Sequence, residues 1–226
     1  MINIILLEHT PNPDRLIARA AAQCYEENFV GSLHYAKSAI KGEKLINKVI
    51  EMGHTSVLEH ASFTFAIEGI SRSLSHQLVR FRHASFSQQS QRYVAFKENE
   101  LFEYITPVSI AKIAMLEAEY EEVMNTCKRF YDMAIRMKVP AEDARFVLPN
   151  ATETKIVMTM NAREIYHACN LRECAHAQWE IRELFTIINR LVKEKAPVTF
   201  NKLGPSCVTK GFCSEGPRCC GRINNP

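Results

Sequence analysis

The seventeen residues from Gln77 to Tyr93 carry three arginines and four glutamines without one acidic side chain. Gln77 and Arg80 are three residues apart, so they share one face of a helix. The serines and glutamines that follow, with exposed backbone N–H groups, could wrap an anion, and an arginine fork suits phosphate or carboxylate. The alternative is a solvated basic loop, but such loops usually carry Lys, Asp and Gly. The stretch therefore predicts an anion-binding site.

A second polar stretch runs from Asn161 to Trp179. Spacings of three and four residues place one stripe along a helix: Ile165, Ala168, Cys169, Arg172 and His176. The stripe begins apolar and ends in a cation and an imidazole, and Arg163 and His167 form a second pair four residues apart. A buried arginine must be paired or must meet a ligand. The stripe thus predicts either a ligand contact at Arg172 or an internal salt bridge to Glu173 or Glu180.

Two shorter features are weaker. Residues 53–60 join a helix pattern to a strand pattern and offer His54, Glu59 and His60 as metal ligands, yet they lack the spacing of H-E-x-x-H. A polar loop with hydrogen-bonded histidines is the favoured interpretation of this segment. Arg145 alone is a cation at a helix end.

Composition limits the classes that remain. The 226 residues are 46% hydrophobic and 23% charged, which fits a globular protein with one large domain. A net charge of +3 is too small to indicate binding to nucleic acid or to a membrane surface. No apolar run approaches the roughly 20 residues of a membrane helix. The first residues have no basic leader, so no signal peptide is predicted and the expected compartment is the cytoplasm.

Glycine positions exclude two enzyme classes. No two of the eight glycines are separated by a single residue, so the G-x-G-x-x-G dinucleotide loop is absent. Gly211 and Gly216 have the spacing of a P-loop, but Pro217 and Arg218 follow them. Any phosphate must therefore be held by side chains, chiefly arginine, and by helix ends.

Periodicity predicts an α+β fold, a mostly helical single domain with a small, mainly antiparallel sheet. We expect the domain to span residues 1–203, followed by a Cys/Gly/Pro-rich tail, 204–226. Ser71 and Asn161 are the expected N-caps of two helices. The expected strands are 3–7 (buried), 61–67 and 154–160 (with helix as the alternative), and the expected helices are 14–25, 36–52, 71–80, 107–138, a short one from 140, 161–172 and 176–195. Phe63, Phe65 and Ile67 share one face of the second strand. The apolar stripe of the 107–138 helix includes Val123, Met124, Phe130, Tyr131 and Ala134.

Four cysteines lie in helical patterns, and Cys207, Cys213, Cys219 and Cys220 lie in the tail. The tail spacing is not the C-x2-C of zinc ribbons, so reduced thiols are favoured over a bound metal or cluster, which stays the alternative. Without an export signal, disulfides are disfavoured.

Taken together, these stretches resemble the flavin-dependent thymidylate synthases. That family's fingerprint is Arg-His-Arg, two residues, Ser, one residue, usually Asn, two residues, Ser, one residue, Arg, and residues 80–92 match it. Residues 53–60 match its Gly-His-x-Ser/Thr-x-x-Glu-His segment, 145–149 its Arg before Val-Leu-Pro, and 161–180 its Asn-Ala-Arg, Asn-Leu-Arg and His-Ala-Gln-Trp-Glu blocks. Four blocks in order, over about residues 45–200, are far more specific than one motif.

The resemblance implies a methyltransferase that converts dUMP to dTMP. Methylenetetrahydrofolate is the family's carbon donor, FAD reduced by NADPH supplies the hydride, and tetrahydrofolate is released. The resemblance also implies an α+β fold and a homotetramer that shares its active sites. From the net charge and the lack of a long apolar run, we expect no nucleic-acid or membrane partner.

Carried over by position, the implied dUMP contacts are Gln77, Leu78, Val79, Arg80, Gln88, Gln89, Ser90, Gln91, Arg92, Arg145 and Arg172. The implied FAD contacts are Ser56, Arg80, Phe81, Arg82, His83, Gln88, Asn161, Arg163 and His167. His54, Glu59 and His176 match further polar positions of the family's flavin pocket. The arginine at the position of Arg172 is held to promote ionisation of the uracil ring.

The residue types agree with this chemistry. Arg80, Arg92, Arg145 and Ser90 could bind a phosphate, and the permanent charge of Arg172 could stabilise an ionised ring without titrating. No Pro-Cys pair occurs, so the cysteine-dependent route to thymidylate is disfavoured.

Four positions depart from the family pattern. Phe81 replaces the middle His of the fingerprint, Ser87 replaces Asn, Gln88 replaces a common acidic residue, and His167 replaces an Asn. Phe81 lacks a donor but can pack on an aromatic ring, so we expect it to tune flavin affinity and to leave activity in place.

Two other functions remain as alternatives. One is a metal-dependent nucleotide hydrolase that uses His54, Glu59 and His60. The other is a single-strand RNA-binding module in which Arg80, Phe81, Arg82 and Phe86 form a stacking platform.

Overall fold

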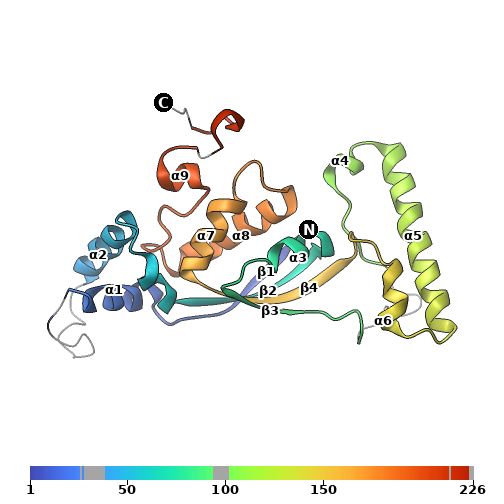
Figure 1. The fold of residues 1–226 in the computed structure, drawn as a ribbon, viewed down its shortest axis with the longest axis horizontal. Helices are drawn as coiled ribbons and strands as arrows, with labels where there is room; N and C mark the ends of the chain where they lie inside the picture. Colours follow the sequence, from blue (N-terminus) through green and yellow to red (C-terminus); the bar gives the residue numbers. More distant parts are fainter. Residues whose placement is uncertain (26, 28–38, 94–101, 214, 224–226) are drawn as a thin grey trace. The chain divides into compact units, whose positions relative to one another are not determined.

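The computed structural model describes residues 1–25, 27, 39–93, 102–213 and 215–223. The chain forms two compact units, and each contains part of the sheet (Figure 1). Unit 1 comprises Met1–Asn3, Ile67–Arg80 and Ser87–Val157. Unit 2 comprises Ile4–Ala66, Phe81–Phe86 and Met158–Pro226.

One sheet has the strand order β1-β2-β4-β3, and its strands are β1 (Asn3–His9), β2 (Ser62–Ser71), β3 (Ala84–Gln88) and β4 (Glu153–Asn161). β1 and β2 are antiparallel, because Thr10 near the end of β1 pairs with Ser62 at the start of β2. β2 and β4 are also antiparallel, since the hydroxyls of Thr64 and Thr159 lie 2.9 Å apart while Gly69 N donates to Glu153 at 3.2 Å. The predicted α+β fold is confirmed.

Strand β2 shows how the alternating pattern becomes a buried face. Phe63, Phe65 and Ile67 are at most 2% exposed, as their spacing of two residues predicted. Residues 154–160 are strand, not helix. β1 is a strand as expected, but it is not fully buried: Ile5 and Leu7 are about half exposed.

Unit 2 carries the helices α1 (Pro13–Gln23), α2 (Ala39–Glu51), α7 (Ala162–Arg172), α8 (Trp179–Lys195) and α9 (Ser206–Lys210), and the 3-10 segments η2 (Thr55–His60) and η4 (Gly216–Arg218). α7 packs against η2, α8 and α9. Asn161 caps α7 by accepting from the Glu164 N–H at 2.9 Å, as predicted. The side of α8 that carries Leu184, Phe185 and Ile188 is fully buried. α9 shows that part of the tail is helical.

Asp14 joins an early segment of unit 2 to a late one. Its carboxylate accepts hydrogen bonds from the backbone N–H groups of Val198 (3.0 Å) and Thr199 (2.9 Å). The contact joins the first turn of α1 to the segment that follows α8.

Unit 1 carries α3 (Arg72–Leu78), α4 (Val108–Ala111), α5 (Ala114–Arg136), α6 (Ala141–Ala144) and η3 (Arg145–Val147). Ser71 caps α3, because its side chain accepts from Leu74 N at 2.9 Å, as predicted. The single helix expected over 107–138 is wrong at its start. Ile113 has extended backbone angles (φ −122°, ψ 97°), which a β-branched residue adopts readily, so α4 ends and α5 begins separately.

The expected apolar stripe of α5 is buried on one edge only. Met124, Tyr131 and Ala134 are at most 8% exposed, whereas Val123 and Phe130 are about half exposed. Among the described residues, no helix is long and apolar enough to cross a membrane.

Candidate active site

The end of α3 presents the first group of predicted substrate contacts in unit 1. Gln77 is half-buried, while Val79 and Arg80 are exposed. Leu78 is fully buried, so its side chain belongs to the core and only its main chain is available to a ligand. The side chains that remain for ligand binding are an amide and a guanidinium.

Gln88, the last residue of β3, is anchored by two hydroxyl groups. Its Nε2 donates to Ser75 Oγ of α3 at 2.9 Å and to Thr154 Oγ1 of β4 at 3.1 Å. Ser75 and Thr154 are almost fully buried. The amide nitrogen of Gln88 is therefore committed to the protein, and its carbonyl oxygen is the group left for a ligand.

Arg92 and Arg145 converge on Glu142 of α6. Arg92 pairs with the Glu142 carboxylate at 2.9 Å, and Arg145 Nε donates to the Glu142 carbonyl oxygen at 3.1 Å. Ser90 Oγ accepts from the Arg92 N–H at 3.2 Å, which turns the chain after β3. Three predicted substrate contacts, Ser90, Arg92 and Arg145, thus lie in one group, with Glu142 as a partner that the sequence analysis did not identify. Gln89 and Gln91 flank Ser90, and the Gln89 N–H pairs with the Lys155 carbonyl.

Sequence reasoning also missed Arg72. Partial burial lowers the pKa of its guanidinium, and the like charge of Arg145 lowers it further. Two guanidinium groups that repel one another form a site that an anion would stabilise. The only signal in the sequence was its place directly after the helix cap Ser71.

In unit 2, Arg163 of α7 pairs with Glu59 of η2. This pair is about half exposed. The metal interpretation of residues 53–60 needed the same carboxylate as a ligand, and the arginine now occupies it. Among the described residues, no group of three His, Cys, Asp or Glu side chains is placed to hold a metal ion.

Phe81 lies at the centre of an aromatic cluster in unit 2. Its ring is 6% exposed and meets Phe185 of α8 edge-on, with centroids 5.6 Å apart. His167 of α7 contacts the same ring at 6.1 Å. The guanidinium carbon of Arg172 lies 5.6 Å from the ring centroid. Phe81 therefore contacts two predicted site residues of α7.

Arg172 is the last residue of α7 and is half-buried. Its Nε is buried and has no hydrogen-bond partner among the described residues. Among the described residues, Arg172 does not form the alternative salt bridge to Glu173 or Glu180. Its guanidinium contacts the Phe81 ring instead. Within the part of the chain that the structure describes, no carboxylate is bonded to the Arg172 guanidinium.

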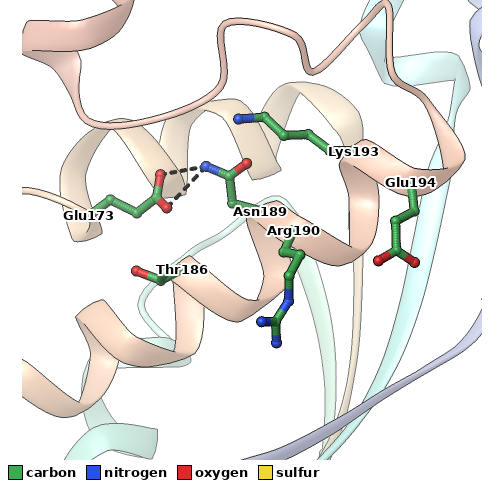
Figure 2. A pocket seen from close by; sticks show the side chains of 6 residues that line it. All are labelled: Glu173, Thr186, Asn189, Arg190, Lys193 and Glu194. Atoms are coloured by element: carbon green, nitrogen blue, oxygen red, sulfur yellow. Dashed lines mark hydrogen bonds between the residues drawn. The ribbon is translucent and has the colours of Figure 1, made fainter.

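Glu173, the next residue, fixes the chain after α7. Both carboxylate oxygens accept from Asn189 Nδ2 of α8, at 3.0 and 2.9 Å (Figure 2). The same amide donates to the Leu203 carbonyl at 3.1 Å. Burial raises the pKa of Glu173. Glu173 and Asn189 border a surface pocket of about 460 Å³ that is also lined by Arg190 and Lys193.

The tail reaches this part of unit 2 as well. His176 was expected on the α7 stripe, but it lies exposed beyond the end of that helix. Its Nε2 hydrogen bonds to the carbonyl oxygen of Arg218 in η4. Thr209 of α9 donates to Asn170 Oδ1 of α7 at 2.6 Å. The tail therefore contacts α7 and a predicted flavin-pocket residue, although the expected domain ended at residue 203.

Two ionisable side chains of α7 are inert because they are buried. Burial raises the pKa of Tyr166 to about 12 and raises the pKa of the Cys169 thiol well above its ordinary value. Neither group ionises near neutral pH, so neither is a candidate nucleophile or base. None of the eight cysteines, all of which lie among the described residues, forms a disulfide bond.

The residues in unit 2 fit a bound flavin dinucleotide. Arg82, Arg163, His83 and His167 are exposed cations or donors, which a pyrophosphate and a polar ring edge require. Asn161 uses its oxygen as the α7 cap, so its amide nitrogen remains to donate. Ser56 and His54 are exposed in or beside η2.

Comparison with known proteins agrees with this interpretation. Residues 5–198 match the family described as thymidylate synthase complementing protein. The flavin-dependent thymidylate synthase of Geobacter sulfurreducens is 50% identical over 221 residues, covering 98% of this chain and 94% of that protein. Those of Clostridium tetani (43% identical, 98% and 94% covered) and Pyrococcus furiosus (40% identical, 95% and 90% covered) are similar along almost the whole chain. A match to 98% of the chain extends past residue 203, so it includes much of the tail.

Matches of this extent and identity establish the family. The chain belongs to the flavin-dependent thymidylate synthases, enzymes that form thymidylate by methyl transfer with a flavin cofactor.

Proposed function

We propose that this chain catalyses the reductive methylation of dUMP at its uracil ring. In the balanced reaction, dUMP, methylenetetrahydrofolate, NADPH and one proton give dTMP, tetrahydrofolate and NADP⁺. The folate contributes a one-carbon unit, and a hydride completes the methyl group. When bound, FAD supplies the hydride-transfer chemistry between NADPH and this one-carbon unit.

The single observation that carries the proposal is the environment of Arg172. Its buried Nε has no acceptor among the described residues, and its guanidinium carbon lies over the Phe81 ring. A fixed cation stabilises negative charge that develops on a ligand, because it needs no reorganisation. A uracil ring that loses its N3 proton develops such charge on its carbonyl oxygens.

In this proposal the cations of unit 1 hold the nucleotide phosphate. Arg92, Arg145 and Arg72 supply guanidinium groups, and Ser90 adds a hydroxyl donor. Gln77, Arg80 and the carbonyl oxygen of Gln88 orient the rest of the nucleotide. Phosphate binding would relieve the repulsion between Arg72 and Arg145, which adds to the effect of burial in lowering the pKa of Arg72.

The flavin contacts are proposed on the exposed polar groups of unit 2. Arg82, His83 and Arg163 suit the pyrophosphate, and Asn161 and His167 suit a polar ring edge. Ser56, His54 and His176 are proposed to border the same cofactor. We further propose a cytoplasmic homotetramer with shared active sites.

The test begins with the absorption spectrum of the purified protein after incubation with FAD and removal of free flavin. NADPH is then added without oxygen and with dUMP present, and dTMP is measured after methylenetetrahydrofolate is supplied. We expect a retained flavin that bleaches, followed by one dTMP for each NADPH consumed. Retention without bleaching would reject NADPH as reductant, and bleaching without dTMP would reject the methyl transfer.

A chelator separates this proposal from the metal-dependent hydrolase. Activity that survives exhaustive chelation dismisses the hydrolase, whereas loss of activity with release of phosphate from the nucleotide would favour it.

A further inference from the structure

We propose that Phe81 is a positioning residue for Arg172: its ring holds the guanidinium in place without neutralising it. The inference rests on the proposed function, because it assigns Arg172 to charge that develops on dUMP. It concerns a position where this chain departs from the family fingerprint.

The Phe81 ring is held in one orientation by its neighbours. Phe81 is 6% exposed, and Phe185 and His167 each meet it edge-on, at 5.6 and 6.1 Å between centroids. A ring held from two sides cannot turn freely, so the surface it offers to Arg172 is fixed. The guanidinium carbon lies 5.6 Å from the ring centroid, within the range of a cation–π contact.

The backbone below Arg172 is fixed as well. The Glu173 N–H donates to Cys169 O at 3.0 Å, and the Glu173 side chain is held by Asn189 of α8. Cys169 and Asn189 are buried. The main chain at residue 172 is therefore rigid, and the position of the guanidinium depends on what its side chain touches.

The identity of that contact decides the chemistry. A carboxylate would hold the guanidinium more firmly, but it would cancel the charge and use two of the five N–H donors. A ring attracts the cation through its quadrupole and takes no donor in its plane. Phe81 thus keeps Arg172 in place while its charge and its N–H groups stay available for a ligand.

A histidine at this position would act differently. When protonated it would repel Arg172, and when neutral its ring is a weaker cation–π partner than Phe. His167 already places an imidazole against the Phe81 ring, with the ring centroids 6.1 Å apart. Phe81 therefore matches the surroundings of Arg172 better than the family's usual residue would.

The first test replaces Phe81 with mono-, di- and trifluorophenylalanine, which keep the shape of the ring and progressively weaken its attraction for cations. We expect kcat for dTMP formation to fall at each step, about 10-fold or more in total, since a desolvated cation–π contact is worth about 2 kcal/mol. KM for dUMP and Kd for FAD should stay within about twofold of the wild-type values, because the shape of the pocket is unchanged. Phe81→Tyr should keep most of kcat.

The matched control is the same fluorinated series at Phe185. That ring is fully buried in the same cluster. Its series should leave kcat unchanged. The inference is wrong if kcat does not change across the fluorinated variants at Phe81, or if it falls equally across those at Phe185.

The second test needs no substrate. Urea unfolding of wild type, Phe81→Leu, Arg172→Met and the double variant, at one protomer concentration, measures the coupling between the two side chains. We expect a coupling of about 3- to 30-fold in the unfolding equilibrium constant. If the effects of the two substitutions are additive, the inference is wrong. A wild-type protein that forms no dTMP would instead overturn the proposed function, whatever the unfolding cycle shows.

Discussion

The rings of Phe81 and His167 meet edge to face, with centroids 6.1 Å apart and planes at 87°. Both positions depart from the family pattern described above, where a His and an Asn are usual. The two departures are thus neighbours in space, although they are 86 positions apart in the chain. Position 81 lacks the imidazole that is usual in the family, and its neighbour His167 carries one instead.

This contact makes Phe81→His a sensitive probe of the flavin site. We expect the substitution to change FAD affinity and to leave dUMP affinity nearly unchanged, because His167 is a proposed flavin contact and rests on the altered ring. Flavin fluorescence titration and calorimetry with dUMP measure the two constants. An equal loss of both affinities would contradict the expectation, and His167→Asn combined with Phe81→His should give non-additive effects.

Arg172→Lys tests the planar guanidinium. Lysine keeps the charge but loses the fork and the stacking on Phe81, so kcat should fall about 10²- to 10³-fold, the usual cost of removing an electrostatic stabiliser. Thermal unfolding should change by only a few degrees. Arg190→Lys, an exposed arginine of α8, is the control and should have wild-type kcat. Near-normal turnover in Arg172→Lys would remove Arg172 from its assigned role.

Glu142 competes with any phosphate for Arg92. Glu142→Gln frees this guanidinium, so we expect dUMP to bind up to about fivefold more tightly, within the 0–1 kcal/mol of a half-exposed ion pair. Glu122→Gln removes a similarly exposed pair with Arg129 on α5 and should leave dUMP affinity unchanged. Weaker binding in Glu142→Gln would mean that Glu142 orients Arg92 and does not compete with the ligand.

The buried carboxyl of Glu173 predicts a pH dependence of stability. Because burial raises its pKa above the ordinary value of 4.5, the folded protein binds this proton more tightly than the unfolded chain does. Its contribution is therefore most favourable below pH 4.5 and is lost as pH rises to the raised pKa.

Urea unfolding across this range, in wild type and in Glu173→Gln, isolates the contribution. The difference between their unfolding free energies should change with pH only between 4.5 and the raised pKa. Glu194→Gln, an exposed carboxylate at the same pocket, controls for the lost charge. A difference that stays constant over the whole range would show that Glu173 titrates normally.

We expect a side chain at position 69 to lower the stability of the fold substantially. Its φ is +71°, and a Cβ there would lie 2.4 Å from the Met1 carbonyl oxygen. Gly53 has a similar φ of +76° with nothing within 4 Å of a built Cβ. Gly53→Ala should therefore cost about 1 kcal/mol of stability from backbone strain alone, and Gly69→Ala about 1–3 kcal/mol more from the clash. Equal losses in urea unfolding would show that the chain at Met1 moves aside freely.

Local rules predicted the elements and their caps. The alternation of Phe63, Phe65 and Ile67 identified β2, and the hydroxyl of Ser71 and the amide of Asn161 identified two helix starts, because these signals depend on neighbours in the chain. The expected helix over 107–138 was wrong at Ile113, where no Gly or Pro marks the interruption. Backbone choice at such a residue depends on packing that a local pattern does not contain.

The site was predictable as a set of residues, but its partners were not. Arginine-rich stretches identified Arg92, Arg145 and Arg172 as candidates. Glu142 and Arg72 were missed, because what distinguishes them is a neighbour 50 or more residues away. For Arg172 the sequence left a salt bridge and a ligand equally open, and only the fold places Phe81 beside it.

The bonds from Asp14 to Val198 and Thr199 have a consequence for synthesis of the chain. This carboxylate leaves the ribosome early, but its partners follow 184 and 185 residues later. Unit 2 cannot complete its core until nearly the whole chain has emerged, because these bonds join its first helix, α1, to the segment that follows α8. Contacts of such long range slow folding, and the period before they form is when this chain is most exposed to aggregation and most dependent on chaperones.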